Sequence, residues 1–251
     1  MKKHKFSFKK IFKIIGKITL WFIVISVVIT VAYTWINPPA TPLMLTRKIN
    51  SGYSINYQWI NIEQMPQSII NCTVAAEDNF FLAHNGIDFG AIEKAIDDNE
   101  QGKRLRGGST ITQQTAKNVF LWQGRSWVRK GFEVYFTFLI ETFWSKKRIM
   151  EVYLNVIEMG KGVYGVQAAA QHYFRKDAKN LSANQAALIV ASFPSPLTRN
   201  PAKPTSYLQR RANFILSISK KIGAVKFDKQ SIQAAKARYN AYKAKKKKQK
   251  K

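Results

Sequence analysis

Eight consecutive residues, Gly107-Gly108-Ser109-Thr110-Ile111-Thr112-Gln113-Gln114, bring together backbone donors, hydroxyls and amides, thirty residues after the acidic pair Glu77-Asp78. The two glycines let the backbone approach a bound group closely. Ser109 is a good N-cap for a helix that begins at Thr110, and the first amides of such a helix carry a partial positive charge. The stretch therefore predicts either a site for an oxyanion such as phosphate or an ordinary Gly-Gly turn before a capped helix.

The N-terminal segment has the composition of a membrane anchor. Residues 18–36 are uncharged and apolar, and as a helix they span about 28 Å, close to the thickness of a bilayer core. Trp21 and Trp35 lie near its ends, and seven lysines precede it. We therefore expect a basic cytoplasmic leader over 1–17, a single-pass anchor in the cell (inner) membrane, and the remaining chain outside the cytoplasm.

Two other interpretations of this segment fit less well. A cleaved signal peptide would have a shorter apolar run, and Asn37-Pro38-Pro39 is a poor cleavage site. A buried core helix of a soluble domain would alternate with polar positions, which this stretch does not do.

Size, cysteine count and charge indicate one basic domain after the anchor. About 190 residues remain for it, enough for one core but not for a second large domain. Cys72 is the only cysteine, so an internal disulfide is impossible, and the three histidines are too scattered to predict a metal site. The fourteen lysines of the leader and of the tail over 243–251 leave +13 of the net charge of +27 for the body. This charge favours an anionic substrate or membrane surface, and the location excludes nucleic acid.

The body has a helical pattern nearly throughout, so we expect a mainly α domain with at most a short strand over 53–57. The expected divisions are a linker over 37–61, the domain over 62–225 and a basic tail over 226–251. The lysine-rich run over 243–251 within this tail is expected to be a solvated, disordered run first and a binder of anionic headgroups second. Helices are predicted over 66–76, over 89–101, after Ser109, Ser126 and Ser145, over 165–174, from the capping box Ser182/Gln185 to before Pro194, and over 205–221.

Two glutamates stand out as candidates for chemistry. Glu77 ends a helix that faces the core, where desolvation raises the pKa of a carboxyl and suits it to act as a general base. A solvated helix-end acid is the alternative, and Asp78 could equally be the base or only a cap. Glu133 lies 56 residues further on, with Arg129 at i−4 and Lys130 at i−3, a pattern also typical of ion contacts on a helix surface.

Five motifs follow one another along the chain. They are Glu77-Asp78-Asn79-Phe80-Phe81-Leu82-Ala83-His84-Asn85-Gly86, the opening stretch with Lys117-Asn118, Arg129-Lys130-Gly131-Phe132-Glu133, Ile149-Met150-Glu151-Val152-Tyr153-Leu154-Asn155, and Tyr164-Gly165-Val166-Gln167-Ala168-Ala169-Ala170-Gln171-His172-Tyr173-Phe174. In this order they resemble the motifs of the peptidoglycan glycosyltransferase family, found in class A penicillin-binding proteins and in monofunctional biosynthetic transglycosylases. The resemblance covers about residues 62–201 and leaves no room for a transpeptidase domain, so it is to the monofunctional enzymes.

The resemblance implies a lysozyme-like helical domain that polymerises lipid II in cell wall biogenesis. Such an enzyme joins the GlcNAc C4 hydroxyl of lipid II to the MurNAc C1 of a lipid-linked growing chain, with inversion and release of undecaprenyl diphosphate. Glu77 would be the base, and Glu133 would position the donor diphosphate directly or through a divalent cation. The residues at substrate-binding positions are Ser109, Thr112, Gln113, Gln114, Lys117, Arg125, Arg129, Lys130 and Lys176.

The implied partners are lipid II, the lipid-linked glycan chain, the membrane and other cell-wall synthesis proteins. No cofactor is expected to be required, although the resemblance leaves room for Mg²⁺ or Mn²⁺ at the diphosphate. Arg175 departs from the family pattern, which often has glycine there, so the turn and the role of Lys176 are less defined. Arg125 is assigned by its spacing in a loop. His84 is expected to make a structural hydrogen bond, and Glu151 and Asn155 are expected to brace the site.

Two rival functions remain. A lysozyme-like enzyme that cleaves glycan would use Glu77 as an acid, and the Gly-Gly-Ser-Thr motif argues against it. A non-catalytic, membrane-anchored protein that binds wall polymer would have no need of both Glu77 and Glu133.

Overall fold

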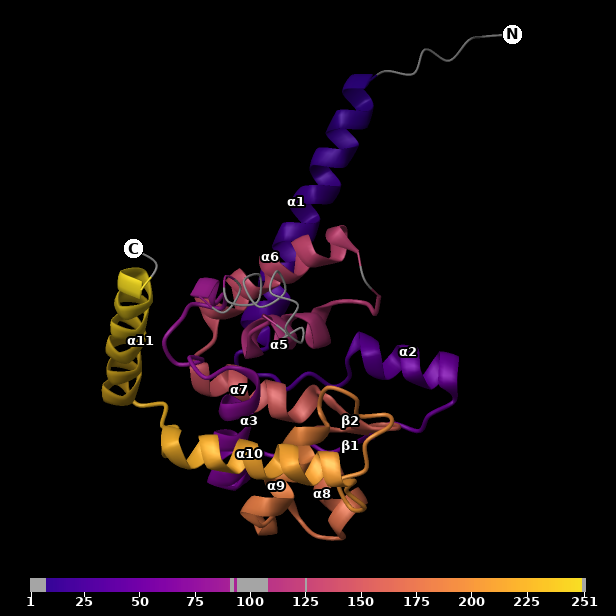
Figure 1. Cartoon of the computed structure of the whole chain (residues 1–251). Helices are drawn as coiled ribbons and strands as arrows, with labels where there is room; N and C mark the ends of the chain where they lie inside the picture. The colour runs from indigo at the N-terminus through magenta and orange to yellow at the C-terminus, as the bar shows by residue number, and fades with distance from the viewer. Residues whose placement is uncertain (1–7, 91–92, 94–107, 125, 250–251) are drawn as a thin grey trace. The chain divides into compact units, whose positions relative to one another are not determined.

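The computed structural model describes residues 8–90, 93, 108–124 and 126–249, and it divides into two units, Met1–Asn37 and Pro38–Lys251 (Figure 1). The first unit contains helix α1, Phe8–Ala32. Its residues 9–32 form the one helix in the described part of the chain that is long and apolar enough to cross a membrane. The helix begins before the predicted 18–36 because the lysines of the leader are themselves good helix formers. An N-terminal apolar helix compatible with a single-pass anchor is thus confirmed.

The second unit is mainly α-helical, as predicted. Among its described residues, three very short strands form a sheet in the order β1-β3-β2, with β1 parallel and β2 antiparallel to β3. The strands are β1 Asn56–Tyr57, β2 Glu158–Gly160 and β3 Val163–Tyr164. The helices are α2 Pro42–Ser51, α3 Gln67–Glu77, α5 Ile111–Phe120, α6 Trp127–Phe143, α7 Lys146–Val156, α8 Gly165–Phe174, α9 Ala183–Ser192, α10 Ser206–Ile222 and α11 Lys229–Gln249, with 3-10 turns at Ile62–Gln64 and Ala178–Asn180.

Helix starts follow the capping residues of the sequence, with one correction. Ser126, Ser145 and Ser182 cap α6, α7 and α9 as predicted. Helix α5 is capped by Thr110, not by Ser109. Of these two residues, only Thr110 is followed three positions later by a glutamine, Gln113. The Thr110 hydroxyl accepts from the backbone N–H of Gln113, and the Gln113 side chain accepts from the backbone N–H of Thr110, which together form a capping box.

The core positions the ends of three helices beside one another. Helix α3 packs against α9 and α10, while α5 packs against α6 and α7. Ile69, Ile111 and Met150 are fully buried, one from each of α3, α5 and α7. Hydrogen bonds from α5 to Glu77 and Asp78 join the end of α3 to α5, which packs on α7.

Two segments differ from expectation because they are held by distant partners. The predicted linker 37–61 carries helix α2, whose Arg47 pairs with Glu158 of β2 at 2.9 Å. Strand β1 lies within 53–57, where a short strand was expected. The basic tail 226–251 contains α11, in which Tyr239 is buried and its hydroxyl donates to Asp88 at 2.6 Å. The lysine run over 243–251, predicted to be disordered, continues this helix as far as Gln249. The predicted helix over 89–101 lies mostly outside the described residues.

Candidate active site

Glu77 is the last residue of α3, and its carboxyl is partly buried. The Gln114 side-chain amide donates to Glu77 Oε2 at 2.9 Å. Burial is the main influence and raises the pKa of Glu77, opposed by the hydrogen bond from Gln114 and by the charge of Arg211. A carboxyl with a raised pKa next to a polar partner is suited to take up a proton. The predicted desolvation of Glu77 is therefore present in the structure.

Asp78 connects three segments of the fold, and its role as an alternative base stays a prediction. Its side chain is buried, and its oxygens lie 2.9 and 3.0 Å from His84 Nε2. Ile111 N, in the first turn of α5, donates to Asp78 Oδ2 at 3.1 Å. Asp78 thus joins the start of α5 to the segment after α3. The contact of His84 is the structural hydrogen bond that was expected.

Tyr153, from α7, orients Gln114 towards Glu77. Its hydroxyl donates to Gln114 Oε1 at 3.2 Å, which turns the amide nitrogen of Gln114 to the carboxylate. Burial raises the pKa of Tyr153 well above its usual value, so the hydroxyl remains a donor. Tyr153 lies in the fourth sequence motif, but no role for it was predicted. A buried tyrosine needs a hydrogen-bond partner for its hydroxyl, so the apolar surroundings of Tyr153 in the sequence could have indicated a polar contact at this position.

Glu133 occupies a different environment on α6. It is buried, and its two oxygens accept from Arg129 Nη1 at 2.9 Å and Lys130 Nζ at 2.5 Å. Lys117 of α5 lies within the electrostatic reach of both glutamates: burial lowers the pKa of Lys117, and Glu133 and then Glu77 oppose this. No hydrogen bond or ion pair engages the Lys117 ammonium in the described part of the chain. The structure therefore gathers Lys117, Arg129 and Lys130 around Glu133.

Two predicted substrate contacts have their polar groups turned inward. Thr112 Oγ1 donates to Glu141 Oε1 at 2.6 Å, and Gln113 completes the capping box of α5. Both side chains are buried, so in this structure they position α5. Ser109, by contrast, is exposed just before the helix. Roles of all three in binding substrate stay predictions.

Arg125 and Lys176 are the remaining predicted site residues. Arg125 and Gly107 lie outside the described residues. Lys176 follows α8, after Arg175, whose backbone is left-handed at φ 55°. Within the described residues, no hydrogen bond or ion pair links Lys176 to either glutamate. The role of Lys176 stays a prediction.

The expected brace is confirmed by side-chain contacts. Glu151 Oε1 accepts from Ile62 N at 3.0 Å, and the Asn155 side chain bonds both the N–H and the carbonyl of Ile60. These bonds hold the segment that leads into α3 against α7. Such a brace fixes the helix that ends at Glu77.

Arg211 is a site residue that sequence reasoning missed. It lies on α10, 134 residues after Glu77, and its charge acts on that carboxyl. Its Nε is buried and has no hydrogen-bond partner within the described residues. No local sequence pattern predicts that Arg211 lies near Glu77, because this proximity depends on the packing of α10 against α3.

The outer face of α6 is apolar and exposed. Trp127, Val134 and Phe138 lie on that face at helical spacing and are 91%, 40% and 69% exposed. A cluster of this kind on a basic domain is typical of a surface that contacts another apolar phase or partner.

Comparison with known proteins gives a consistent result. The family model described as Transglycosylase matches residues 44–220. A relative from Bacteroides thetaiotaomicron, named biosynthetic peptidoglycan transglycosylase, is 49% identical over 215 residues, which is 84% of this chain and 87% of the relative. A relative with the same name from Pseudomonas aeruginosa is 47% identical, over 82% of this chain and 91% of its own length. Another from Caulobacter vibrioides is 50% identical, over 80% of this chain and 86% of its own length. The chain, a helical glycosyltransferase in architecture and motif order, therefore belongs to the transglycosylase family.

Proposed function

We propose that this protein polymerises the glycan strands of peptidoglycan from lipid II. The lipid-linked growing chain is the donor, and the GlcNAc C4 hydroxyl of a lipid II molecule is the acceptor. The observation that carries the proposal is the pairing of a desolvated carboxyl, Glu77, with a separate cationic group, Lys117, Arg129 and Lys130 around Glu133. The names of the relatives support the same substrate class.

The reaction uses the two groups at opposite ends of one displacement. Glu77 takes the proton of the C4 hydroxyl as its oxygen forms a bond to MurNAc C1. The bond from C1 to the diphosphate oxygen breaks, the configuration at C1 inverts, and undecaprenyl diphosphate leaves. The leaving group gains negative charge, which Lys117, Arg129 and Lys130 stabilise by charge-assisted hydrogen bonds.

Glu133 serves this step by positioning cations. Its two oxygens are held by Arg129 and Lys130, so it fixes both side chains before the diphosphate arrives. We propose that no metal is required. Both Glu133 oxygens already face cations. A Mg²⁺ or Mn²⁺ ion at the diphosphate would be bound by substrate oxygens with Glu133 as its protein ligand.

The membrane anchor and the apolar face of α6 suit a substrate that carries a lipid. We propose that α1 crosses the inner membrane once, with the N-terminus cytoplasmic and the second unit outside the cytoplasm. Holding enzyme and lipid-linked substrate in one plane raises their effective concentration. Other cell-wall synthesis proteins are the partners that we expect at the same membrane.

The test is to incubate the detergent-purified full chain with labelled lipid II and to separate the products by size. Long glycan strands are the expected product. Shortening of added, preformed glycan without new strands would favour the lysozyme-like enzyme. Binding of lipid II with no product at all would favour the non-catalytic wall-binding protein. Repeating the assay in EDTA tests the metal proposal, since loss of polymerisation that Mg²⁺ restores would contradict it.

A further inference from the structure

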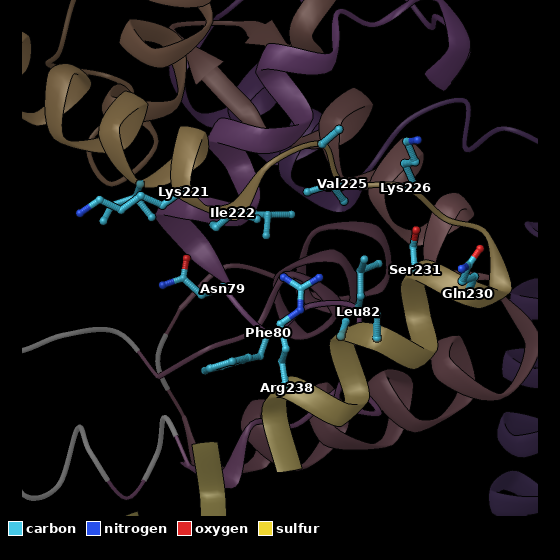
Figure 2. Close-up of a pocket in the computed structure, with 15 residues that line it drawn as sticks. Asn79, Phe80, Leu82, Lys221, Ile222, Val225, Lys226, Gln230, Ser231 and Arg238 are labelled. Atoms are coloured by element: carbon cyan, nitrogen blue, oxygen red, sulfur yellow. The ribbon is translucent and has the colours of Figure 1, made fainter. Parts of the chain in front are cut away.

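A groove of about 560 Å³ opens between the turn after Glu77, the end of α10 and helix α11 (Figure 2). Its volume falls within the range of about 300–1,000 Å³ typical of small-molecule sites. Among the described residues, fifteen line it; none of these is an acid, and three are cations, Lys221, Lys226 and Arg238. Most of the wall is apolar and includes Val74, Phe80, Leu82, Ile218, Ile222 and Val225.

Arg238 gives the groove a defined polar end. Figure 2 shows its side chain rising from α11 towards Phe80 and Leu82. No hydrogen bond or ion pair engages its guanidinium within the described residues. An unpaired guanidinium beside an apolar wall matches a ligand with a phosphate at one end and a hydrocarbon chain at the other.

We propose that this groove binds one anionic phospholipid, with its phosphate on Arg238 and an acyl chain along Phe80, Leu82 and Ile222. A free phosphate ion would leave the apolar wall against water, whereas an acyl chain covers it. The family match ends at residue 220, so Lys221 and the whole of α11 lie beyond it. The inference goes beyond the polymerase proposal and does not depend on it.

A lipid in the groove would contact the turn next to the candidate base. Phe80 lies three residues after Glu77, and its ring is 4.9 Å from the ring of Tyr239 and 5.1 Å from that of Tyr242. Tyr239 in turn is bonded to Asp88. The lipid would therefore fasten α11 to the turn from Phe80 to Leu82 and restrain the backbone that follows Glu77.

Photo-crosslinking of the full chain in detergent tests this site without requiring turnover. The probe is a phosphatidylglycerol with a diazirine on one acyl chain, compared with the matching phosphatidylcholine, and mass spectrometry maps the labelled peptides. We expect phosphatidylglycerol to label peptides that contain residues 80–82 or 218–225, well above phosphatidylcholine. Excess inorganic phosphate should leave this labelling unchanged. Labelling confined to residues 8–36, or labelling displaced by inorganic phosphate, would overturn the proposal.

Three variants make the test specific to the groove. Arg238→Glu should lower labelling of these peptides about tenfold, since a charge-assisted contact becomes a repulsion. Arg210→Glu makes the same change of charge at an exposed position on α10 that does not line the groove, and it should leave the labelling unchanged. Ala235→Phe fills the groove without changing charge and should also lower labelling. Equal labelling of all three variants and the natural chain would contradict the assignment, and failure to polymerise lipid II would not affect it.

Discussion

Glu77 and Glu133 are both glutamates within a basic helical domain, yet the structure gives them opposite surroundings. Glu77 has an amide as its close partner, and burial raises the pKa of its carboxyl. Glu133 has two cations on its two oxygens. The difference shows that the residue type alone does not set the role. Partners make one glutamate able to accept a proton and make the other an anchor for cations.

Replacing Glu77 by glutamine should have the largest effect. We expect Glu77→Gln to lower the rate of lipid II polymerisation by about 10³-fold or more, because the base is lost while the shape is kept. Glu63→Gln, at an exposed acid, is the matched control and should polymerise normally. Polymerisation by Glu77→Gln at the rate of the natural chain would refute the assignment of the base.

The same substitution should raise stability at neutral pH. Because the folded-state pKa of Glu77 lies above its ordinary value of 4.5, the ionised carboxyl costs stability above the folded pKa. The cost disappears as the pH falls below 4.5. Thermal unfolding should therefore show Glu77→Gln to be more stable than the natural chain at pH 7 and equal to it at low pH.

Glu133→Gln should lower the polymerisation rate by about 10²-fold, because Arg129 and Lys130 lose the group that positions them for the diphosphate. Its effect on stability should have the opposite sign from that of Glu77→Gln, since two cations lose a buried partner. The unfolding temperature at pH 7 measures this. A higher unfolding temperature in both Glu77→Gln and Glu133→Gln would contradict the proposed difference between the two glutamates.

Gln114→Leu should have a smaller effect, about tenfold on kcat, because it removes the hydrogen bond that orients Glu77 but leaves the carboxyl in place. Steady-state kinetics with lipid II measure it. Gln209→Leu, at an amide whose bonds lie on the surface of α10, is the control. Unchanged kcat in Gln114→Leu would show that Glu77 is oriented by other groups.

Arg175→Gly should change stability and leave both glutamates as they are. Arg175 has φ 55°, a conformation that costs a residue with a Cβ about 1–2 kcal/mol and that glycine adopts freely. After the greater flexibility of glycine in the unfolded chain is subtracted, we expect a gain of about 0.5–1 kcal/mol in the free energy of unfolding. Denaturant titration measures it, and Arg175→Ala should give no gain. A lower free energy of unfolding in Arg175→Gly would show that contacts of the Arg175 side chain stabilise the turn.

Local signals in the sequence predicted much of the fold and part of the site. The caps Ser126, Ser145 and Ser182 and the helix over 165–174 are set by residues within one or two turns, and the structure has them. The shift of the α5 cap to Thr110 was also local, since the position of Gln113 announces it. Short-range chemistry was therefore sufficient wherever a helix start depended on its own neighbours.

Contacts between distant segments could not be predicted from the sequence. The pairing of Arg47 with Glu158, the burial of Tyr239 against Asp88 and the charge of Arg211 near Glu77 each join residues more than 100 positions apart. These partners hold α2 in the expected linker and α11 in the basic tail. The spacing of residues along the sequence does not indicate such pairs. The contacts of Tyr153 and Arg211 could therefore be identified only in the folded structure.

The pH dependence of kcat/KM for lipid II polymerisation tests the central claim most directly, since it reports the protonation of the free enzyme's base. We predict that the rate rises with pH through one acidic limb, with its midpoint above 4.5, the ordinary pKa of the carboxyl. In Gln114→Leu the limb should move to still higher pH, because the lost hydrogen bond favoured the ionised form of Glu77. A midpoint at or below 4.5, or a limb that Gln114→Leu leaves in place, would contradict Glu77 as the desolvated base.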